Sequence, residues 1–193
     1  FRDLDTATEQ LTQNAKLVAS DLGYSDSFGT SVSLSGAVGL VGATRERNIG
    51  GNGNGSAYVF RDLDTATGTL TENAKLVPSD PGYDDMFGTS VSLAGAMGLV
   101  GASQENNYYG SAYLFRGLDT ATGTITENVK LVASDGQYFD KFGTSVSLAG
   151  TVGLVGAIQE EVNNGSAYLF RGLDTATGTI TENVKLVASD GAI

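Results

Sequence analysis

Polar and apolar residues alternate in short segments along this chain of 193 residues. In the segment FGTSVSL, which begins at Phe28, we expect Phe28, Thr30, Val32 and Leu34 to point to one side of a strand. Glycine and serines point to the other side, so one face is bulky and the other small. This is expected where one sheet nests on the next. No segment carries a sustained apolar stripe of helical period, so we expect very little helix.

Three more strands follow each such segment. VGLVGA (38–43) is apolar on both faces, and its glycines mark places where a neighbouring backbone approaches closely. GSAYVFR (55–61) alternates Ser56, Tyr58 and Phe60 against the intervening side chains. A fourth strand lies near TENAKLVPS (71–79), and Pro78 marks it as an edge strand.

These segments recur in a fixed order. FGTSVSL begins at Phe28, Phe87 and Phe142, GLVGA at Gly39, Gly98 and Gly153, and GSAY at Gly55, Gly110 and Gly165. The 22 residues from Phe115 to Gly136 return without a substitution from Phe170 to Gly191. All length variation lies between GLVGA and GSAY, which places it in one loop of each repeat.

Repeated units of about 40–60 residues with four antiparallel strands are typical of β-propeller blades. A β-solenoid is the competing interpretation, but its repeats are usually much shorter. We therefore predict an all-β chain with three complete four-stranded blades and a half-blade, as a partial or multi-chain propeller. The predicted units are a half-blade at 1–27 (end of a third strand, fourth strand and connecting loop) and blades at 28–86, 87–141 and 142–193.

The Phe-Gly pair of each first strand and the Gly-Ala pair of each second strand resemble the FG-GAP repeat of integrin alpha N-terminal-like β-propellers. These pairs are Phe28-Gly29 with Gly42-Ala43, Phe87-Gly88 with Gly101-Ala102, and Phe142-Gly143 with Gly156-Ala157. The run of FGTSVSL, LVGA, GSAYVF and KLVASD is similar to the bacterial subtype, and the resemblance covers almost the whole chain. It implies a bacterial extracellular or cell-surface protein.

The chain departs from this family in two ways. Thr44, Ser103 and Ile158 replace the proline of Gly-Ala-Pro. Integrin-type blades also carry an Asp-rich calcium loop between the first two strands, whereas the turns here (35–39, 94–98 and 149–153) contain no carboxylate. Calcium needs about six or more oxygen ligands, several of them charged. We therefore predict no calcium in these turns, and neither a metal site nor a cofactor.

Composition narrows the chemistry further. The chain contains no Cys and no His, so thiolates and imidazoles are absent as nucleophiles, general bases and metal ligands. Its 11 basic and 22 acidic residues give a net charge of −11, which disfavours nucleic acid and anionic membranes as partners. No apolar run is long enough to span a bilayer.

In a propeller, the fourth-to-first and second-to-third connections emerge on the same face, and here the second set varies most. Loops on a rigid scaffold usually carry the binding groups. The candidate ligand-binding residues are Arg45, Arg47, Glu105, Asn107, Tyr108, Tyr109, Glu160 and Glu161. Tyr108 and Tyr109 are the strongest candidates, because no repeat requires them and exposed aromatic residues are favoured at recognition surfaces.

The fourth-to-first connections repeat a pair of aspartates five residues apart. The pairs are Asp21 with Asp26, Asp80 with Asp85, and Asp135 with Asp140. Such a pair can bind a cation, act as acid and base, or cap backbone N–H groups in a tight turn. Its recurrence in every blade favours capping, since catalysis needs only one pair. Beside these pairs lie Tyr24, Tyr83 and Tyr138, which we interpret as blade-packing residues rather than as ligand-stacking ones.

Together these features predict an extracellular or cell-surface recognition or adhesion module that binds a protein or glycan through the variable upper loops. A structural, self-assembling scaffold or filament subunit is the alternative. A carboxylate-based glycoside hydrolase is a second alternative, but no unique acidic constellation stands out, and we predict neither an enzyme nor catalytic residues. Apolar open blade ends predict self-association, either as a closed ring of two chains or as a head-to-tail filament.

Overall fold

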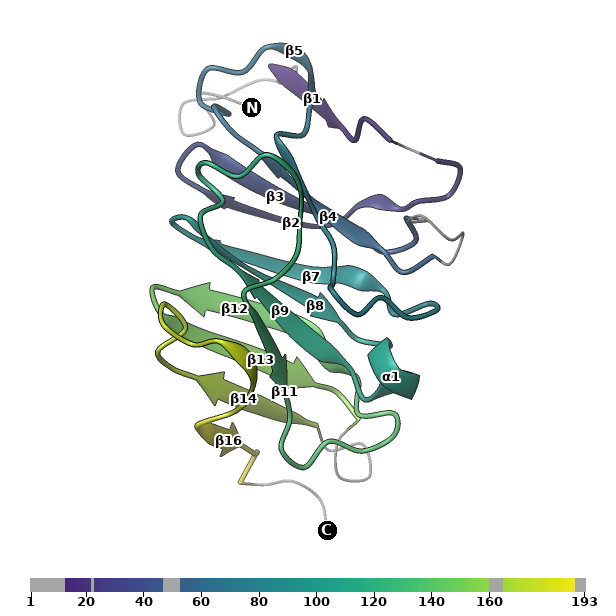
Figure 1. The fold of residues 1–193 in the computed structure, drawn as a ribbon, viewed down its shortest axis with the longest axis vertical. Helices are drawn as coiled ribbons and strands as arrows, with labels where there is room; N and C mark the ends of the chain where they lie inside the picture. Colours follow the sequence, from purple (N-terminus) through teal and green to yellow (C-terminus); the bar gives the residue numbers. More distant parts are fainter. Residues whose placement is uncertain (1–12, 22, 47–52, 160–164, 190–193) are drawn as a thin grey trace.

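The computed structural model describes residues 13–21, 23–46, 53–159 and 165–189. Across these residues the chain is all-β, as the alternation of polar and apolar positions predicts. A short helix, α1 (Glu105–Tyr108), lies in a loop and contains residues with non-helical backbone angles. The sheets stack along the long axis of the molecule as successive partial propeller blades (Figure 1).

Each blade contains the four predicted strands, and neighbouring strands in this set are antiparallel. Blade 1 consists of β2 (Phe28–Ser35), β3 (Val38–Ala43), β4 (Ser56–Phe60) and β6 (Ala74–Leu76). Blade 2 consists of β7 (Phe87–Ala94), β8 (Met97–Ala102), β9 (Ser111–Phe115) and β11 (Val129–Val132). Blade 3 consists of β12 (Phe142–Ala149), β13 (Val152–Ala157), β14 (Ser166–Phe170) and β16 (Val184–Leu186).

The half-blade contributes its fourth strand, β1 (Ala15–Val18). Its predicted third strand falls in residues 1–12, which lie outside the described residues. The limits of the four predicted units stay a prediction.

The prediction that the fourth strand is an edge strand is wrong for β6 and β11, each of which has a neighbouring strand on both sides. The turn that follows each third strand continues into an extra strand, namely β5 (Gly68–Thr71), β10 (Gly123–Ile125) or β15 (Gly178–Thr181). Each of these crosses to the preceding blade and pairs in parallel with its fourth strand. The backbone edge of that strand is thereby covered. Pro78 does not interrupt this pairing, because β6 ends before it.

The hydrophobic core lies between consecutive sheets. Leu40 and Leu76 of blade 1 pack with Phe87, Val91 and Tyr113 of blade 2 in one buried cluster. The equivalent residues of blades 2 and 3 form a second cluster. Each sheet is therefore stabilised mainly by its neighbour, as in other repeat proteins in which one unit cannot bury its own apolar face.

The small face of each first strand also bonds to the next blade, as its pattern predicts. The Ser33 hydroxyl oxygen accepts a hydrogen bond from the backbone N–H of Leu93 at 2.9 Å, and the Ser31 hydroxyl donates to the carbonyl oxygen of Gly88 at 2.7 Å. The equivalent serines of blade 2 make the same two bonds to blade 3. The small serine side chains therefore allow the blades to approach closely, and they also form hydrogen bonds between the blades.

Glycine in the second strand is required by this stacking. A Cβ atom added at Gly101 would lie 2.0 Å from the carbonyl oxygen of Gly143 in the next blade, and one added at Gly42 would lie 2.1 Å from the carbonyl oxygen of Gly88. Real Cβ atoms are not found so close to a carbonyl oxygen. The predicted close approach at this glycine is confirmed.

We expect Gly101→Ala to push blades 2 and 3 apart and to lower the free energy of unfolding by roughly 2–3 kcal/mol, the upper range for overpacked cores. Gly156→Ala is the matched control. A Cβ atom added at Gly156 would lie 2.4 Å from the Ser145 hydroxyl, just as one added at Gly101 would lie 2.4 Å from the Ser90 hydroxyl. The Cβ atom at Gly156 would, however, meet no carbonyl oxygen of a following blade. Urea unfolding of both variants measures the difference, and equal losses would contradict the stacking argument.

Candidate functional site

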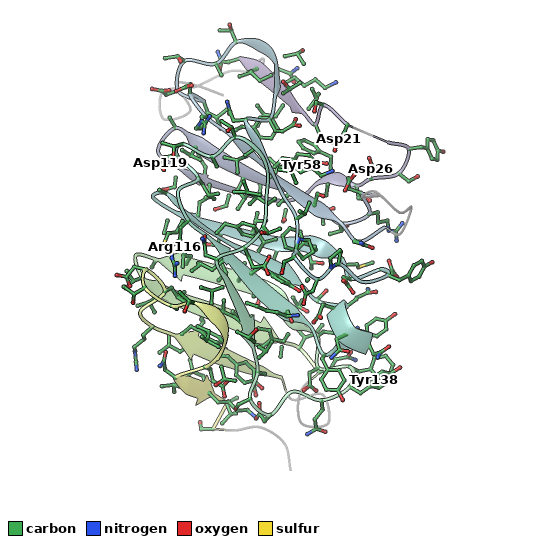
Figure 2. The ribbon with its side chains drawn as sticks, viewed as in Figure 1. Asp21, Asp26, Tyr58, Arg116, Asp119 and Tyr138 are labelled. Carbon is green, nitrogen blue, oxygen red and sulfur yellow. The ribbon has the colours of Figure 1, made fainter. Side chains whose placement is uncertain are left out.

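The loops predicted to share one face of the blades do lie on the same side of the stack. Figure 2 shows Asp21, Asp26 and Tyr138 on this side, and Arg116 and Asp119 on the opposite side. Helix α1, which belongs to a second-to-third connection, lies on the right of the stack in Figure 1, the side on which Figure 2 places Tyr138. We call these connections the upper loops.

A charged cluster joins each upper loop to the next blade. The Tyr58 hydroxyl donates a hydrogen bond to Asp21 Oδ1 at 2.9 Å, and Lys75 Nζ donates to Asp21 Oδ2 at 2.5 Å. Lys75 Nζ also lies 3.0 Å from Glu46 Oε1, and the Glu46 carboxylate accepts a hydrogen bond from the Ser56 hydroxyl. The side chain of Lys75 therefore bridges two carboxylates from two different loops.

The same cluster recurs one repeat later, where Asp80 accepts hydrogen bonds from Tyr113 and Lys130, and Lys130 also pairs with Glu105 at 3.1 Å. In the third copy, Asp135 accepts hydrogen bonds from the Tyr168 hydroxyl at 3.0 Å and from Lys185 at 2.7 Å. Each lysine also lies 5.4–5.9 Å from the ring centroid of its tyrosine. The cluster is therefore a general connection between consecutive repeats.

The electrostatics of this cluster favour fixed charges. Burial alone would raise the pKa of Asp21, but hydrogen bonds from Lys75 and Tyr58 outweigh it and lower that pKa. Burial alone would lower the pKa of Lys75, but hydrogen bonds to Asp21 and Glu46 raise it. Burial, reinforced by the charge of Glu46, raises the pKa of Tyr58. A lysine that stays protonated is neither a nucleophile nor a general base, so the cluster holds loops in place rather than performing acid–base chemistry.

The second aspartate of each pair has a different role. Asp26 accepts a hydrogen bond from the backbone N–H of Gly23, three residues earlier. The same contact joins Asp85 to Gly82 and Asp140 to the N–H of Gln137. These three aspartates are buried, and burial raises the pKa of Asp85. The turn-capping interpretation is confirmed for this member of each pair, whereas the first member forms the charged cluster.

The variable loop of blade 2 is anchored by one of the predicted ligand-binding residues. The Glu105 carboxylate accepts a hydrogen bond from the Ser111 hydroxyl at 2.7 Å and pairs with Lys130. Three consecutive residues after it, Asn106, Asn107 and Tyr108, have positive φ angles of 51°, 60° and 69°. Glu105 therefore acts as a structural anchor, while the next residues form a tight left-handed turn that carries Tyr108.

Tyr108 meets two aromatic residues of the neighbouring upper loop. Its ring centroid lies 5.1 Å from that of Phe139, and the ring of Phe139 lies 4.0 Å from that of Tyr138. Backbone N–H groups of Lys141 and Phe142 donate to the carbonyl oxygens of Tyr108 and Tyr109, which joins the two loops. We call Tyr108, Tyr138 and Phe139 the aromatic cluster. Tyr138 and Phe139 are exposed despite these contacts.

The interpretation of Tyr24, Tyr83 and Tyr138 as blade-packing residues is wrong. All three are exposed. The space between blades is already filled by buried aromatic residues of the strands, such as Phe87 and Tyr113, whose ring centroids lie 5.4 Å apart. The capped turns therefore present their tyrosines to solvent.

Backbone strain distinguishes the aromatic cluster from the equivalent turns. The residue after each of these tyrosines has a positive φ angle, which is 71° at Ser25, 59° at Asp84 and 77° at Phe139. Aspartate tolerates this left-handed conformation well, whereas a bulky aromatic side chain is unusual there. Phenylalanine at this position is therefore not explained by the turn, and such strained residues cluster at functional sites.

A cavity of about 190 Å³ adjoins this loop on blade 2 and extends to the start of the connection that leads to blade 3. Its lining includes Glu105, Tyr109, Lys130, Ser134 and Gly136. The cavity thus offers an aromatic ring together with a lysine and a carboxylate, and it is lined by the same two upper loops that carry the aromatic cluster.

Of the predicted site residues, the structure brings Glu105, Asn107, Tyr108 and Tyr109 into this one region. Arg45 is exposed in the turn after β3 of blade 1. The others, Arg47, Glu160 and Glu161, lie outside the described residues. Phe139 was not among the predicted site residues. The equivalent positions of the repeated turn carry Ser25 and Asp84, so the phenylalanine was a departure from the repeat that the sequence already showed.

Within the described residues, no three Asp or Glu side chains gather in a group that would hold a metal ion. The repeated aspartates are instead engaged by lysine, tyrosine and backbone N–H groups. In the same part of the chain, no helix has the length and apolar character needed to cross a membrane.

A family model described as FG-GAP repeat matches three consecutive stretches of the chain, residues 11–60, 70–115 and 125–170. Each match contains one first, one second and one third strand of a blade. A comparison with curated proteins gives no match.

We expect Asp21→Asn to destabilise the fold by about 0.5–1 kcal/mol near neutral pH, a small effect because Asp21 is 40% exposed and screened by water. Its folded pKa lies below the ordinary value of 3.8, so its contribution is present above that pH and is lost as the pH falls through the lower folded pKa. The difference between the two proteins in urea unfolding should therefore shrink below pH 3.8. Asp64→Asn, which removes the charge of an exposed aspartate in the opposite turn, is the matched control.

We also expect a chelator to leave the thermal unfolding curve unchanged, because the turns 35–39, 94–98 and 149–153 offer no carboxylate to calcium. Calorimetry with calcium and with excess chelator tests this directly. A decrease of several degrees on chelation would show that aspartates elsewhere in the chain bind the ion.

Proposed function

Because the chain belongs to the FG-GAP repeat family, whose repeats generally mediate protein or ligand binding, we propose that it is a recognition or adhesion module. It binds a protein or glycan through its upper loops. Repeats of this family are commonly extracellular, which supports a place outside the cell or on its surface.

The observation that carries this proposal is the aromatic cluster formed by Tyr108, Tyr138 and Phe139, of which Tyr138 and Phe139 are exposed and Tyr108 is half-buried. Two upper loops converge there, the β8–β9 connection within blade 2 and the β11–β12 connection that leads to blade 3, and the backbone angles of Tyr108 and Phe139 are unfavourable for aromatic side chains. Exposed aromatic residues held in place by a rigid scaffold are a common basis of recognition, because they bury much surface at little cost in side-chain entropy.

The dimensions of the site favour a glycan over a protein. The cavity beside the cluster is about 190 Å³, below the roughly 300–1,000 Å³ of sites that enclose a drug-sized ligand. A stable protein interface buries about 800 Å² on each partner, far more than three side chains provide. A sugar unit stacked on the exposed ring of Tyr138 or Phe139 requires neither a larger cavity nor an interface of that area.

The geometry does not favour glycoside hydrolysis. Repeats of this family are typically non-enzymatic. The buried aspartates such as Asp26 and Asp85 cap turns, and Asp21 and Asp80 are held by lysine and tyrosine. A catalytic acid must reach the glycosidic oxygen and change its protonation state, which these fixed groups do not support.

The test is an array of immobilised glycans probed with the intact chain, followed by titration of the strongest hit by calorimetry. Phe139→Asp copies the residue that Asp84 provides in the preceding repeat, so the turn should keep its conformation and its thermal stability. We expect this variant and Tyr108→Ala each to weaken glycan binding by at least about tenfold.

Tyr24→Ala is the matched control, because Tyr24 is exposed in the equivalent turn of the first upper loop. Its affinity should stay within about twofold of the parent chain. An array without a reproducible hit would overturn the glycan assignment. Binding that survives Phe139→Asp would move the site away from the aromatic cluster.

A further inference from the structure

Two tyrosines recur at fixed positions of the repeat. The first lies on the third strand and is buried, and its hydroxyl donates a hydrogen bond to an aspartate of an upper loop (Tyr58, Tyr113 and Tyr168). The second lies in the capped turn, four residues before the phenylalanine that begins the first strand (Tyr24, Tyr83 and Tyr138). The first tyrosine therefore holds the fold together in every copy, whereas the fold does not explain the second.

The second tyrosine is turned to solvent in all three copies. Tyr24 is 96% exposed, Tyr83 is 80% exposed and Tyr138 is 55% exposed. A single exposed tyrosine is ordinary on a protein surface. Here the same side chain returns at the same place, although the residue that follows it is different in each copy. The turn does not require it, because the turn is closed by the aspartate two residues later.

The stacked blades hold these three turns at a regular spacing. Strands β2, β7 and β12 begin just after the turns, and serine hydroxyls join each of them to the next. Packed sheets lie about 10 Å apart, so consecutive turns follow one another at a separation of that order. Figure 2 shows Asp21 and Asp26, which flank Tyr24 in the sequence, on the same side of the stack as Tyr138. We call Tyr24, Tyr83 and Tyr138 the tyrosine row.

We propose that the tyrosine row binds an extended polysaccharide, whose sugar units stack on the tyrosine rings of consecutive blades. This inference rests on the proposed function and extends the glycan site from the aromatic cluster along the upper loops. The C–H groups on one face of a sugar ring carry partial positive charge, so they pack well against the negative face of an aromatic ring. Tyrosine offers this face at a low cost in conformational entropy, because only two side-chain torsions become fixed.

The charges around the tyrosine row favour an uncharged polysaccharide. Three partly exposed aspartates begin these upper loops, and the lysines that neutralise them are largely buried (Asp21 with Lys75, Asp80 with Lys130, Asp135 with Lys185). Within the turns, Asp84 and Lys141 carry opposite charges. The row therefore presents no concentrated positive charge, and the net charge of −11 repels a polyanionic glycan.

The length of the glycan separates this inference from the proposed function. A short glycan on an array reaches one upper loop, so Tyr24→Ala leaves its affinity unchanged. A polysaccharide that spans several blades contacts Tyr24 and Tyr83 as well as the aromatic cluster. Because the later contacts are intramolecular, they raise the affinity, and we expect the polysaccharide to bind at least about tenfold more tightly than a disaccharide of the same linkage.

The test is calorimetric titration of the intact chain with neutral polysaccharides (dextran, mannan and a soluble β-glucan) and with the disaccharide of whichever binds most tightly. The double variant Tyr24→Ala with Tyr83→Ala should lose at least about tenfold in affinity for the polysaccharide and less than about twofold for the disaccharide. Tyr24→Phe with Tyr83→Phe is the matched control, because it keeps both rings, and its affinities should stay within about twofold of the parent chain. Both double variants should melt like the parent chain, since the two side chains are exposed.

Equal polysaccharide affinities of the parent chain and the alanine variant would overturn the inference. So would the absence of binding to any neutral polysaccharide, or tighter binding of a polyanion such as heparin. Phe139→Asp distinguishes these results from a failure of the proposed function. If this variant loses the disaccharide while the alanine variant keeps full polysaccharide affinity, the aromatic cluster is the glycan site and the tyrosine row is rejected. If no disaccharide binds but the alanine variant loses polysaccharide affinity, the row is supported and the aromatic cluster is rejected as a separate site.

Discussion

The close approach of one blade to the next is the constraint on which the rest of this structure depends. The carbonyl oxygens of Gly88 and Gly143 lie where a Cβ atom on Gly42 or Gly101 would have to be. At this separation the serines of one first strand reach the backbone of the next, and the leucines and aromatic residues fill the remaining space. A wider spacing would lose these hydrogen bonds and leave gaps in the core, so the spacing and the core stabilise each other.

The same constraint explains why 22 residues recur without change. This segment supplies contacts in both directions along the stack. Arg116 donates to the carbonyl oxygens of Leu173 and Ala176 in the next repeat, while Glu127 accepts hydrogen bonds from Ser79 in the preceding one. Asp135 accepts from Tyr168 of the next blade. Because every junction has the same geometry, a substitution that improves one contact would have to suit two neighbours.

Much of the fold could be predicted, because the four strands of each blade show alternating polar and apolar residues and because their sequences recur in every repeat. The fifth strand was missed because β10 and β15 pair in parallel with another repeat, which short segments such as Gly123–Ile125 do not indicate by themselves. The split roles of Asp21 and Asp26 also escaped prediction, since spacing alone does not reveal that Lys75 reaches one of them. The role of Phe139 could not be inferred from the sequence, because it depends on contact with Tyr108, which lies in another loop.

The upper loops are held by the same contacts at each of the three junctions that the structure describes. Asp21 lies three residues after β1, and its contacts with Tyr58 and Lys75 fasten this segment to blade 1. Asp80 and Asp135 make the same contacts with the tyrosine and lysine of blades 2 and 3. The aromatic cluster is added to this repeated arrangement, because Phe139 stands where the equivalent turns carry serine or aspartate. The repeated contacts therefore fix where the upper loops lie, and the differences between the loops supply the groups for recognition at the aromatic cluster.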